Sequence, residues 1–136
     1  MSKMIYMSLP VKDLAAATKF YQAIGCEKNE QFSDDKASAM VWSEGLTFQL
    51  LTHERFAAFA TKPIADAQKT SGVLIALPYG SREEVDGITE AAAAAGGKAD
   101  VRERQDLGFI YTRTFEDLDG HVFEPMWMNV EAACEA

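Results

Sequence analysis

The sequence has few of the residues that mark a disulfide scaffold or a metal cluster, with two cysteines and two histidines among 136 residues. Cys26 and Cys134 lie far apart and form no Cys-x-x-Cys motif, so the pattern excludes a disulfide framework and a zinc knuckle. Both are interpreted as reduced thiols. No apolar run approaches the ~20 residues of a membrane helix, and the first residues lack the apolar stretch of a signal peptide. We therefore expect a cytoplasmic protein with no membrane partner.

Positive charge is also scarce, since 13 Lys and Arg stand against 21 Asp and Glu and give a formal net charge of −8. That charge repels a phosphate backbone, so no nucleic-acid partner is expected. The sequence has no Gly-rich phosphate loop and no Gly-x-Ser-x-Gly elbow, and nothing supports a nucleotide-binding protein or a hydrolase. Its 48% hydrophobic and 25% charged residues are typical of a compact domain with a core, which excludes a disordered tail, a collagen and a coiled coil.

Two segments of the chain share one hydrophobic spacing. Apolar residues fall at i, i+3, i+7 and i+10 in both, and an offset of 71 residues relates the two sets: Leu14, Ala17, Tyr21, Ile24 and Val85, Ile88, Ala92, Ala95. Each run ends at a glycine, Gly25 or Gly96, and each begins after a capping residue, Asp13 or Ser81. The spacing predicts the same helix in each half of the chain.

Strand-like runs surround both predicted helices in the same order. We expect strands at residues 4–9, 27–32, 37–42 and 46–51 of the first half, and at 73–77, 98–104, 109–115 and 121–127 of the second. The last hairpins also align, because 75 residues separate Gly45 from Gly120 and Gln49 from Glu124. The pattern predicts an α+β fold of two βαβββ modules, module one at about 1–52 and module two at about 71–128. A connector with a short helix is expected at about 53–70, and a turn or short helix at 128–136.

Several strings carry a family resemblance. Val11-Lys12-Asp13-Leu14 with Phe20-Tyr21, and the segment from Phe115 to Glu124, resemble the first helix and the last hairpin of the vicinal oxygen chelate superfamily. That superfamily includes glyoxalase I, extradiol dioxygenases, and fosfomycin and bleomycin resistance proteins. Lys62-Pro63-Ile64-Ala65-Asp66-Ala67 is similar to a small branch labelled predicted lactoylglutathione lyase. The resemblance implies one glyoxalase-like domain over residues 1–136, with curved mixed sheets around a cavity, helices on the outer face, and a homodimer.

Metal-dependent members of this superfamily place ligands on the first and last strands of each module. The resemblance assigns those positions to Tyr6, Gln49, Leu74 and Glu124. Only Glu124 is of the usual ligand type, since Leu74 has no donor atom and a neutral amide is a weak ligand for a divalent ion. We expect no cofactor, with a divalent metal as the minor alternative. His53 and His121 fall on no ligand position.

Strand alternation directs Gln49 and Glu124 to the cavity, and Phe48, Phe123 and Trp127 to the helices. Glu124 is the catalytic candidate, as a general base; alternatively, it only hydrogen-bonds Tyr6 or Gln49.

The expected partner is a small-molecule ligand, and an arginine among aromatic residues suits an anionic or planar one. The ligand-binding candidates are Tyr6, Gln49, Leu74, Trp42, Tyr111, Arg113 and Met126. Alternatively, the aromatic residues belong to the core and Arg113 pairs with a surface carboxylate. Two functions stay open, a lactoylglutathione lyase-like enzyme with a degenerate metal site and a metal-free protein that sequesters a small molecule.

Overall fold

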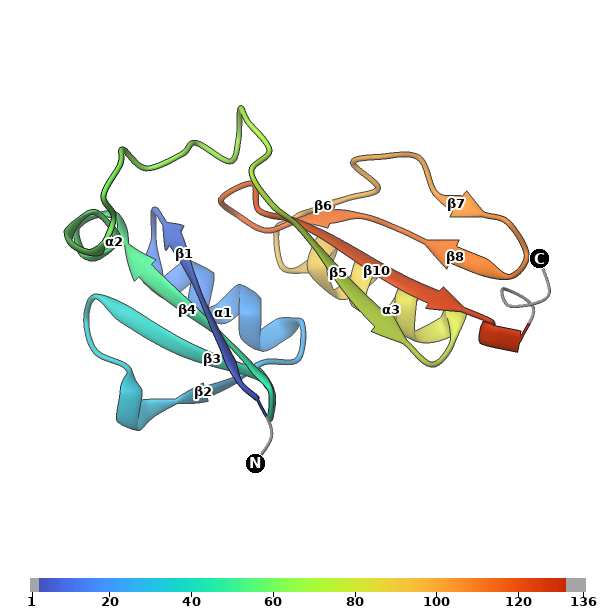
Figure 1. The fold of residues 1–136 in the computed structure, drawn as a ribbon, viewed down its shortest axis with the longest axis horizontal. Coiled ribbons are helices and arrows are strands. Elements are labelled where there is room, and N and C mark those ends of the chain that lie inside the picture. Colours follow the sequence, from blue (N-terminus) through green and yellow to red (C-terminus); the bar gives the residue numbers. More distant parts are fainter. Residues whose placement is uncertain (1–2, 132–136) are drawn as a thin grey trace. The chain divides into compact units, whose positions relative to one another are not determined.

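A computed structural model describes residues 3–131, and its contacts divide the chain into two units, residues up to Asp66 and residues from Ala67 onward. Each unit has one main helix on one face of its own β-sheet (Figure 1). The predicted α+β class is confirmed. Among the described residues, no helix is long and apolar enough to cross a membrane.

Unit 1 contains four strands, two α-helices and a 3-10 helix. They are β1 (Ile5–Val11), α1 (Leu14–Ala23), β2 (Glu27–Asn29), η1 (Glu30–Phe32), β3 (Ala37–Ser43), β4 (Leu46–Thr52) and α2 (His53–Phe59). The sheet order is β1-β4-β3-β2, with β1 parallel to β4 and the other neighbours antiparallel. The helix α2 begins directly after β4, at the start of the expected connector.

The helix α1 forms where the sequence signals place it. The side chain of Asp13 accepts a hydrogen bond from the backbone N–H of Ala16, and Gly25 adopts the left-handed conformation that ends the helix, with φ of 111°. Its buried face packs on the sheet, where the rings of Tyr21 and Phe48 lie 5.5 Å apart. The helix therefore covers one face of the sheet only.

Unit 2 repeats this arrangement with shorter strands. Its elements are β5 (Leu74–Tyr79), α3 (Arg82–Ala94), β6 (Lys98–Ala99), β7 (Gln105–Asp106), β8 (Ile110–Thr112), β9 (Phe115–Glu116) and β10 (Val122–Met128). The long central strand β10 is parallel to β5 and antiparallel to β8 and β9. The outer strands β7 and β6 pair with β8 and β9.

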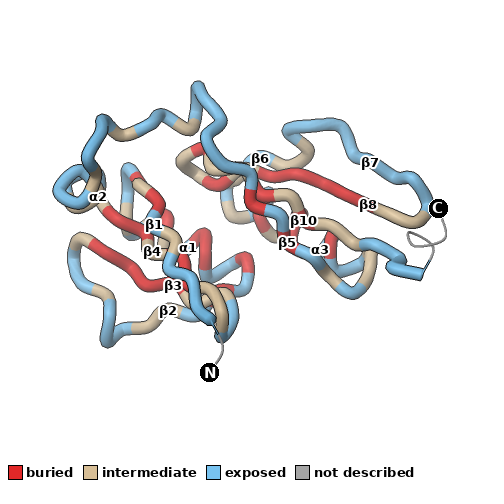
Figure 2. The backbone as a smooth tube through the Cα atoms, viewed as in Figure 1, coloured by how far each residue is buried: buried red, intermediate tan, exposed pale blue. Residues whose placement is uncertain are grey.

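The helix α3 and the sheet enclose the core of unit 2. Ser81 caps the helix by accepting a hydrogen bond from the N–H of Glu84, and Gly96 ends it with φ of 101°. Fully buried Phe115 and Phe123 stack with their ring centroids 5.0 Å apart. Figure 2 shows the buried segments along the sheet strands and along one side of each main helix.

Three predicted strands are shorter than expected. The strand expected at 109–115 is divided into β8 and β9, with residues 113 and 114 outside both. The expected strand at 98–104 is only the two-residue β6, because Asp100 has a left-handed backbone (φ of 54°) that turns the chain out of the ladder. The expected strand at 27–32 stops at Asn29, whose side chain accepts a hydrogen bond from Gln31 N–H and caps η1. Of the turn or short helix expected at 128–136, residues 132–136 lie outside the described residues.

Candidate functional site

The carboxylate of Glu124 lies on the side of its sheet that α3 does not cover. Phe123 and Pro125, its neighbours on β10, are fully buried, whereas the Glu124 side chain is 18% exposed and points the other way. The parallel register places Glu124 beside Ala76 of β5. We call this side of β5 and β10 the open face of unit 2; its residues are Leu74, Ala76, Pro78, Val122, Glu124 and Met126.

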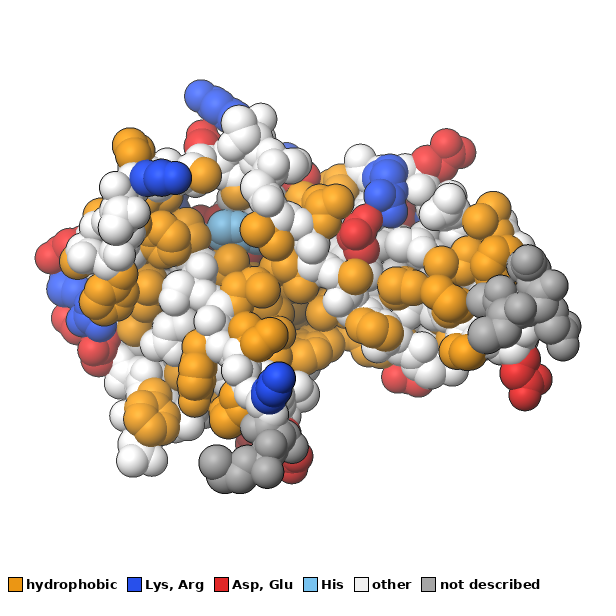
Figure 3. Space-filling view, viewed as in Figure 1, with side chains coloured by type: hydrophobic (Ala, Val, Ile, Leu, Met, Phe, Trp, Pro, Cys, Tyr) orange, Lys and Arg blue, Asp and Glu red, His pale blue; other side chains and the backbone are white. Residues whose placement is uncertain are grey.

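Apart from Glu124, the open face is apolar. All three β5 residues on it are exposed, and Leu74 retains 54% of its accessible surface. Val122 and Met126 flank Glu124 on β10 and are partly exposed. Hydrophobic side chains gather over β5 and β10 in Figure 3. The register also places Glu116 of β9 on this side of the sheet, opposite Val122. An exposed apolar patch beside a carboxylate is typical of a binding surface.

The partner of Glu124 is Arg102, from the loop between β6 and β7. The Nη1 atom of Arg102 lies 2.9 Å from Oε2 of Glu124. Thr114, buried in the sheet, fixes the loop because its hydroxyl accepts a hydrogen bond from the Arg102 N–H at 3.0 Å. The left-handed turn at Asp100 brings the loop back over the sheet, and the Asp100 N–H donates to the Thr114 carbonyl. Sequence analysis missed Arg102; the signal available was a pair of arginines in an expected strand of an acidic chain.

Arg113 lies on the opposite side of the sheet, beneath α3. Its side chain is 2% exposed, and the guanidinium contacts three carboxylates, with Nη1 3.0 Å from Asp86 and 2.9 Å from Glu90, and Nη2 2.8 Å from Asp100. The Asp100 contact is bidentate, because Nε donates to its other oxygen at 3.0 Å. The ion pairs raise the pKa of Arg113, and its guanidinium lowers the pKa of Asp100.

Tyr111 belongs to this same carboxylate cluster. Its hydroxyl donates to Asp86 at 2.6 Å, the largest cause of the lowered pKa of Asp86, while burial raises the pKa of Tyr111. The register pairs Tyr111 with Trp127, so both are on the α3 side of the sheet. Arg82 of α3 caps this pair, with its guanidinium carbon 5.0 Å from the Tyr111 ring centroid and 5.1 Å from the Trp127 ring centroid.

The candidate ligand-binding residues therefore divide between the two sides of the sheets. Leu74 and Met126 share the open face of unit 2 with Glu124. Tyr111 and Arg113 lie on the other side of the sheet. Their contacts match the alternative interpretation, in which Arg113 pairs with carboxylates. Trp42 of unit 1 lies on the helix side as well, with its ring 6.3 Å from that of Phe48.

Tyr6 and Gln49 lie on the side of the unit 1 sheet that α1 does not cover. Gln49 alternates with buried Phe48 and Leu50, and Tyr6 is 63% exposed on β1. The register pairs Gln49 with Ser8, as Glu124 pairs with Ala76 in unit 2. The internal repeat therefore extends to the side-chain orientation of the last strand in each unit.

The donor atoms at the positions of the family's metal ligands do not fit a divalent metal. Tyr6 has a phenol, Gln49 has a neutral amide, and Leu74 has no donor atom. The Glu124 carboxylate is already paired with the Arg102 guanidinium. No group of three or more His, Cys, Asp or Glu side chains among residues 3–131 is arranged to hold a metal ion. His53 is exposed at the start of α2, and the backbone N–H of His121 donates to Asp117 in the last turn.

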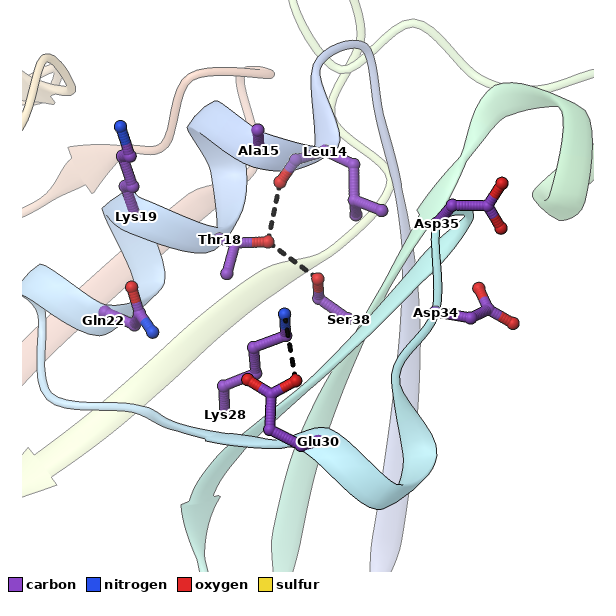
Figure 4. Close-up of a pocket in the computed structure, with 10 residues that line it drawn as sticks. All are labelled: Leu14, Ala15, Thr18, Lys19, Gln22, Lys28, Glu30, Asp34, Asp35 and Ser38. Atoms are coloured by element: carbon purple, nitrogen blue, oxygen red, sulfur yellow. Dashed lines mark hydrogen bonds and ion pairs between the residues drawn. The ribbon is translucent and has the colours of Figure 1, made fainter.

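A separate pocket of about 450 Å³ lies in unit 1 between α1, β2 and the segment that leads into β3 (Figure 4). The Thr18 hydroxyl donates to the Leu14 carbonyl and lies 2.7 Å from the hydroxyl of Ser38. Lys28 pairs with Glu30 at 3.5 Å. These polar groups bind one another. No candidate from the sequence lines it, because its residues form an ordinary amphipathic helix and its neighbours.

Comparison with known proteins places the whole fold in one family. The family model for the Glyoxalase/Bleomycin resistance protein/Dioxygenase superfamily matches residues 3–124, and the chain belongs to this superfamily. A search of curated proteins finds no significant match.

Solved structures similar to the chain include hypothetical protein SA1046 from S. aureus, which is 28% identical with a TM-score of 0.76 and coverage of 93% of this chain and 95% of that one. A family enzyme from Burkholderia phytofirmans PsJN is 18% identical (TM-score 0.75, coverage 93% and 99%) and shows the fold alone. The fosfomycin resistance protein FosX from Listeria monocytogenes is 26% identical (TM-score 0.67, coverage 96% and 97%).

Proposed function

We propose that this protein binds and sequesters a small organic molecule on the open face of unit 2 without a metal ion. The observation that carries the proposal is the Arg102–Glu124 ion pair of 2.9 Å on an exposed apolar face. At this position the family's metal-dependent members have a metal-ligating carboxylate, whereas here the carboxylate has an internal cationic partner. An apolar surface with a few directed polar groups has the composition of a small-molecule site.

We further propose that the protein acts as a homodimer. The strands β1 and β5 each form an edge of their sheet, and both carry exposed apolar side chains, including Ile5, Tyr6 and Leu74. Unpaired edges with apolar side chains favour association with another sheet. A second copy of the chain that packs on the β5 edge would cover the apolar residues there and help to enclose the ligand. Sedimentation equilibrium tests this part of the proposal, and a monomer at micromolar concentration would contradict it.

The ligand proposal is tested by titration calorimetry in excess EDTA, with bleomycin and fosfomycin as the first probes. Membership of a superfamily that contains bleomycin resistance proteins suggests the first probe, and similarity to the fosfomycin resistance protein FosX suggests the second. We expect reversible binding at a fixed stoichiometry, with the probe recovered unchanged by mass spectrometry. If binding of either probe requires an added divalent ion, the metal-independent proposal is wrong.

A second candidate function is lyase-like catalysis with Glu124 as the general base. It is favoured by one feature: among the described residues Arg102 is the only ion-pair partner of Glu124, whose side chain is 18% exposed, so the carboxylate can accept a substrate proton. The assay is turnover of methylglyoxal with glutathione, followed by absorbance. Turnover by the wild type that Glu124→Gln abolishes would favour the enzyme over the binding protein.

A further inference from the structure

We infer that Arg102 is the ligand-anchoring residue of the open face, and that the ligand is a small organic anion with a hydroxyl beside its anionic group and an apolar body. The inference rests on the proposed binding function and adds the class of ligand. It depends on three features of unit 2: the remaining donors on Arg102, the partly exposed carboxylate of Glu124, and the apolar residues around them.

The guanidinium of Arg102 keeps most of its hydrogen-bonding capacity. A guanidinium has five N–H donors in a planar fork that matches a carboxylate or a phosphonate. Among residues 3–131, its one ion-pair partner is Glu124, 2.9 Å from Nη1, and the side chain is 53% exposed. A single carboxylate in a bidentate pair occupies two of the five donors, so other donors remain for a ligand. An incoming anion can therefore bind Arg102 without breaking the existing ion pair.

The loop holds this guanidinium in place before a ligand arrives. The backbone of Arg102 is fixed through its N–H to the hydroxyl of buried Thr114, and two residues earlier Asp100 is held by Arg113 from the other side of the sheet. A side chain anchored at both its backbone and its head group loses less conformational entropy on binding. The Arg102 guanidinium is therefore preorganised to bind an anion.

Glu124 defines the second requirement of the ligand. A bare anion on Arg102 would lie close to this carboxylate and be repelled by it. A hydroxyl beside the anionic group removes the conflict, because it donates a hydrogen bond to the partly exposed carboxylate of Glu124. The pair of side chains therefore selects a 2-hydroxy acid over the same acid without its hydroxyl.

The surroundings of the ion pair fit an apolar body. Leu74, Val122 and Met126 present partly or fully exposed side chains on the same face. An apolar body can therefore pack on these side chains while the anionic group binds Arg102.

The test is calorimetric titration of the full chain, in excess EDTA, with three probes that differ by one group. Mandelate has the carboxylate, the hydroxyl and a phenyl ring; phenylacetate lacks the hydroxyl; 1-phenylethane-1,2-diol lacks the anion. Arg102→Gln removes the proposed anchor. Arg104→Gln is the matched control, because Arg104 lies in the same loop, has a side chain that is also 53% exposed, and carries the same charge.

We expect mandelate to bind the wild type more tightly than either other probe. Arg102→Gln should weaken mandelate binding by at least about tenfold, the loss of one or two charge-assisted hydrogen bonds, while Arg104→Gln retains the wild-type affinity. Equal affinity for mandelate and the diol, or equal losses in the two variants, would overturn the inference while leaving small-molecule binding intact. If none of the three binds, the inference is wrong, and the bleomycin and fosfomycin titrations decide the proposed function separately.

Discussion

Arg113→Met is expected to destabilise the protein strongly, although it changes a residue on the far side of the sheet from the proposed ligand. Methionine retains the aliphatic volume but leaves Asp86, Glu90 and Asp100 without their shared cation. Removing one partner of a buried ion pair costs about 3–5 kcal/mol. The side chains of Asp86 and Glu90 are 46% and 65% exposed, so water solvates them in part once the arginine is gone. The free energy of unfolding should therefore fall by about 3 kcal/mol, the lower end of this range.

The assay is thermal unfolding followed by circular dichroism. A loss of about 3 kcal/mol corresponds to a fall in Tm of roughly 10 °C for a domain of this size. Arg55→Met is the control, since Arg55 pairs with exposed Asp34 at 3.4 Å and its loss should leave the midpoint unchanged. An Arg113→Met midpoint close to that of Arg55→Met would refute the assignment of Arg113 as the central ion pair of unit 2.

The effect of Arg113→Met on stability should depend on pH, in a direction that the pKa shifts of the carboxylates determine. The pKa of Asp86 is lowered by hydrogen bonds from Tyr111 and Arg113, and the pKa of Asp100 is lowered by Arg113. A carboxyl whose pKa is lowered by folding stabilises the native state above its unfolded pKa of about 4, and this contribution is lost as the pH falls through the folded value. The stability difference between wild type and Arg113→Met should therefore shrink below about pH 4. A difference that is constant from neutral pH to pH 3 would contradict this.

Two further predictions concern other residues of unit 2. Glu124→Gln should bind phenylacetate at least as tightly as the wild type, because the substitution removes a negative charge beside the anion site; weaker binding in a calorimetric titration would contradict the ligand model. Gly120→Ala should lower the free energy of unfolding by about 2 kcal/mol or more, because Gly120 has φ of 88° and an added Cβ would lie 2.8 Å from the Ala67 backbone. Gly72→Ala, where an added Cβ meets nothing within 4 Å, is its control, and equal midpoints in urea would disprove the prediction.

The overall fold was predictable because the signals that specify it are local and occur twice. The spacing of apolar residues predicted α1 and α3, and the structure confirms their caps at Asp13 and Ser81. Glycines at the predicted helix ends have the expected positive φ. Alternation along the last strand also placed Glu124 on the side away from the helix correctly, since its two neighbours are apolar and buried.

The site was predictable only in part, because alternation within one strand does not fix the register to the next. Tyr111 and Arg113 have the right composition for a pocket, but the pairing of Tyr111 with Trp127 directs both to the α3 side. Arg102 was missed for a different reason: the left-handed conformation of Asp100, a residue with no strong preference for it, converts a predicted strand into the loop that carries this arginine. Long-range pairing, rather than local pattern, decides which side chains share a face.

The central claim is that the carboxylate of Glu124 has an arginine as its partner where the family's metal-dependent members have a metal ion. It is tested most directly by metal analysis after incubation with excess Ni²⁺, Mn²⁺, Fe²⁺ or Zn²⁺ and desalting, with Glu124→Gln and Arg102→Gln measured in parallel. We predict that the wild type and Glu124→Gln retain equal, substoichiometric amounts of each ion. One ion per wild-type chain, lost in Glu124→Gln and unaffected by Arg102→Gln, would contradict the account and assign Glu124 to a metal centre.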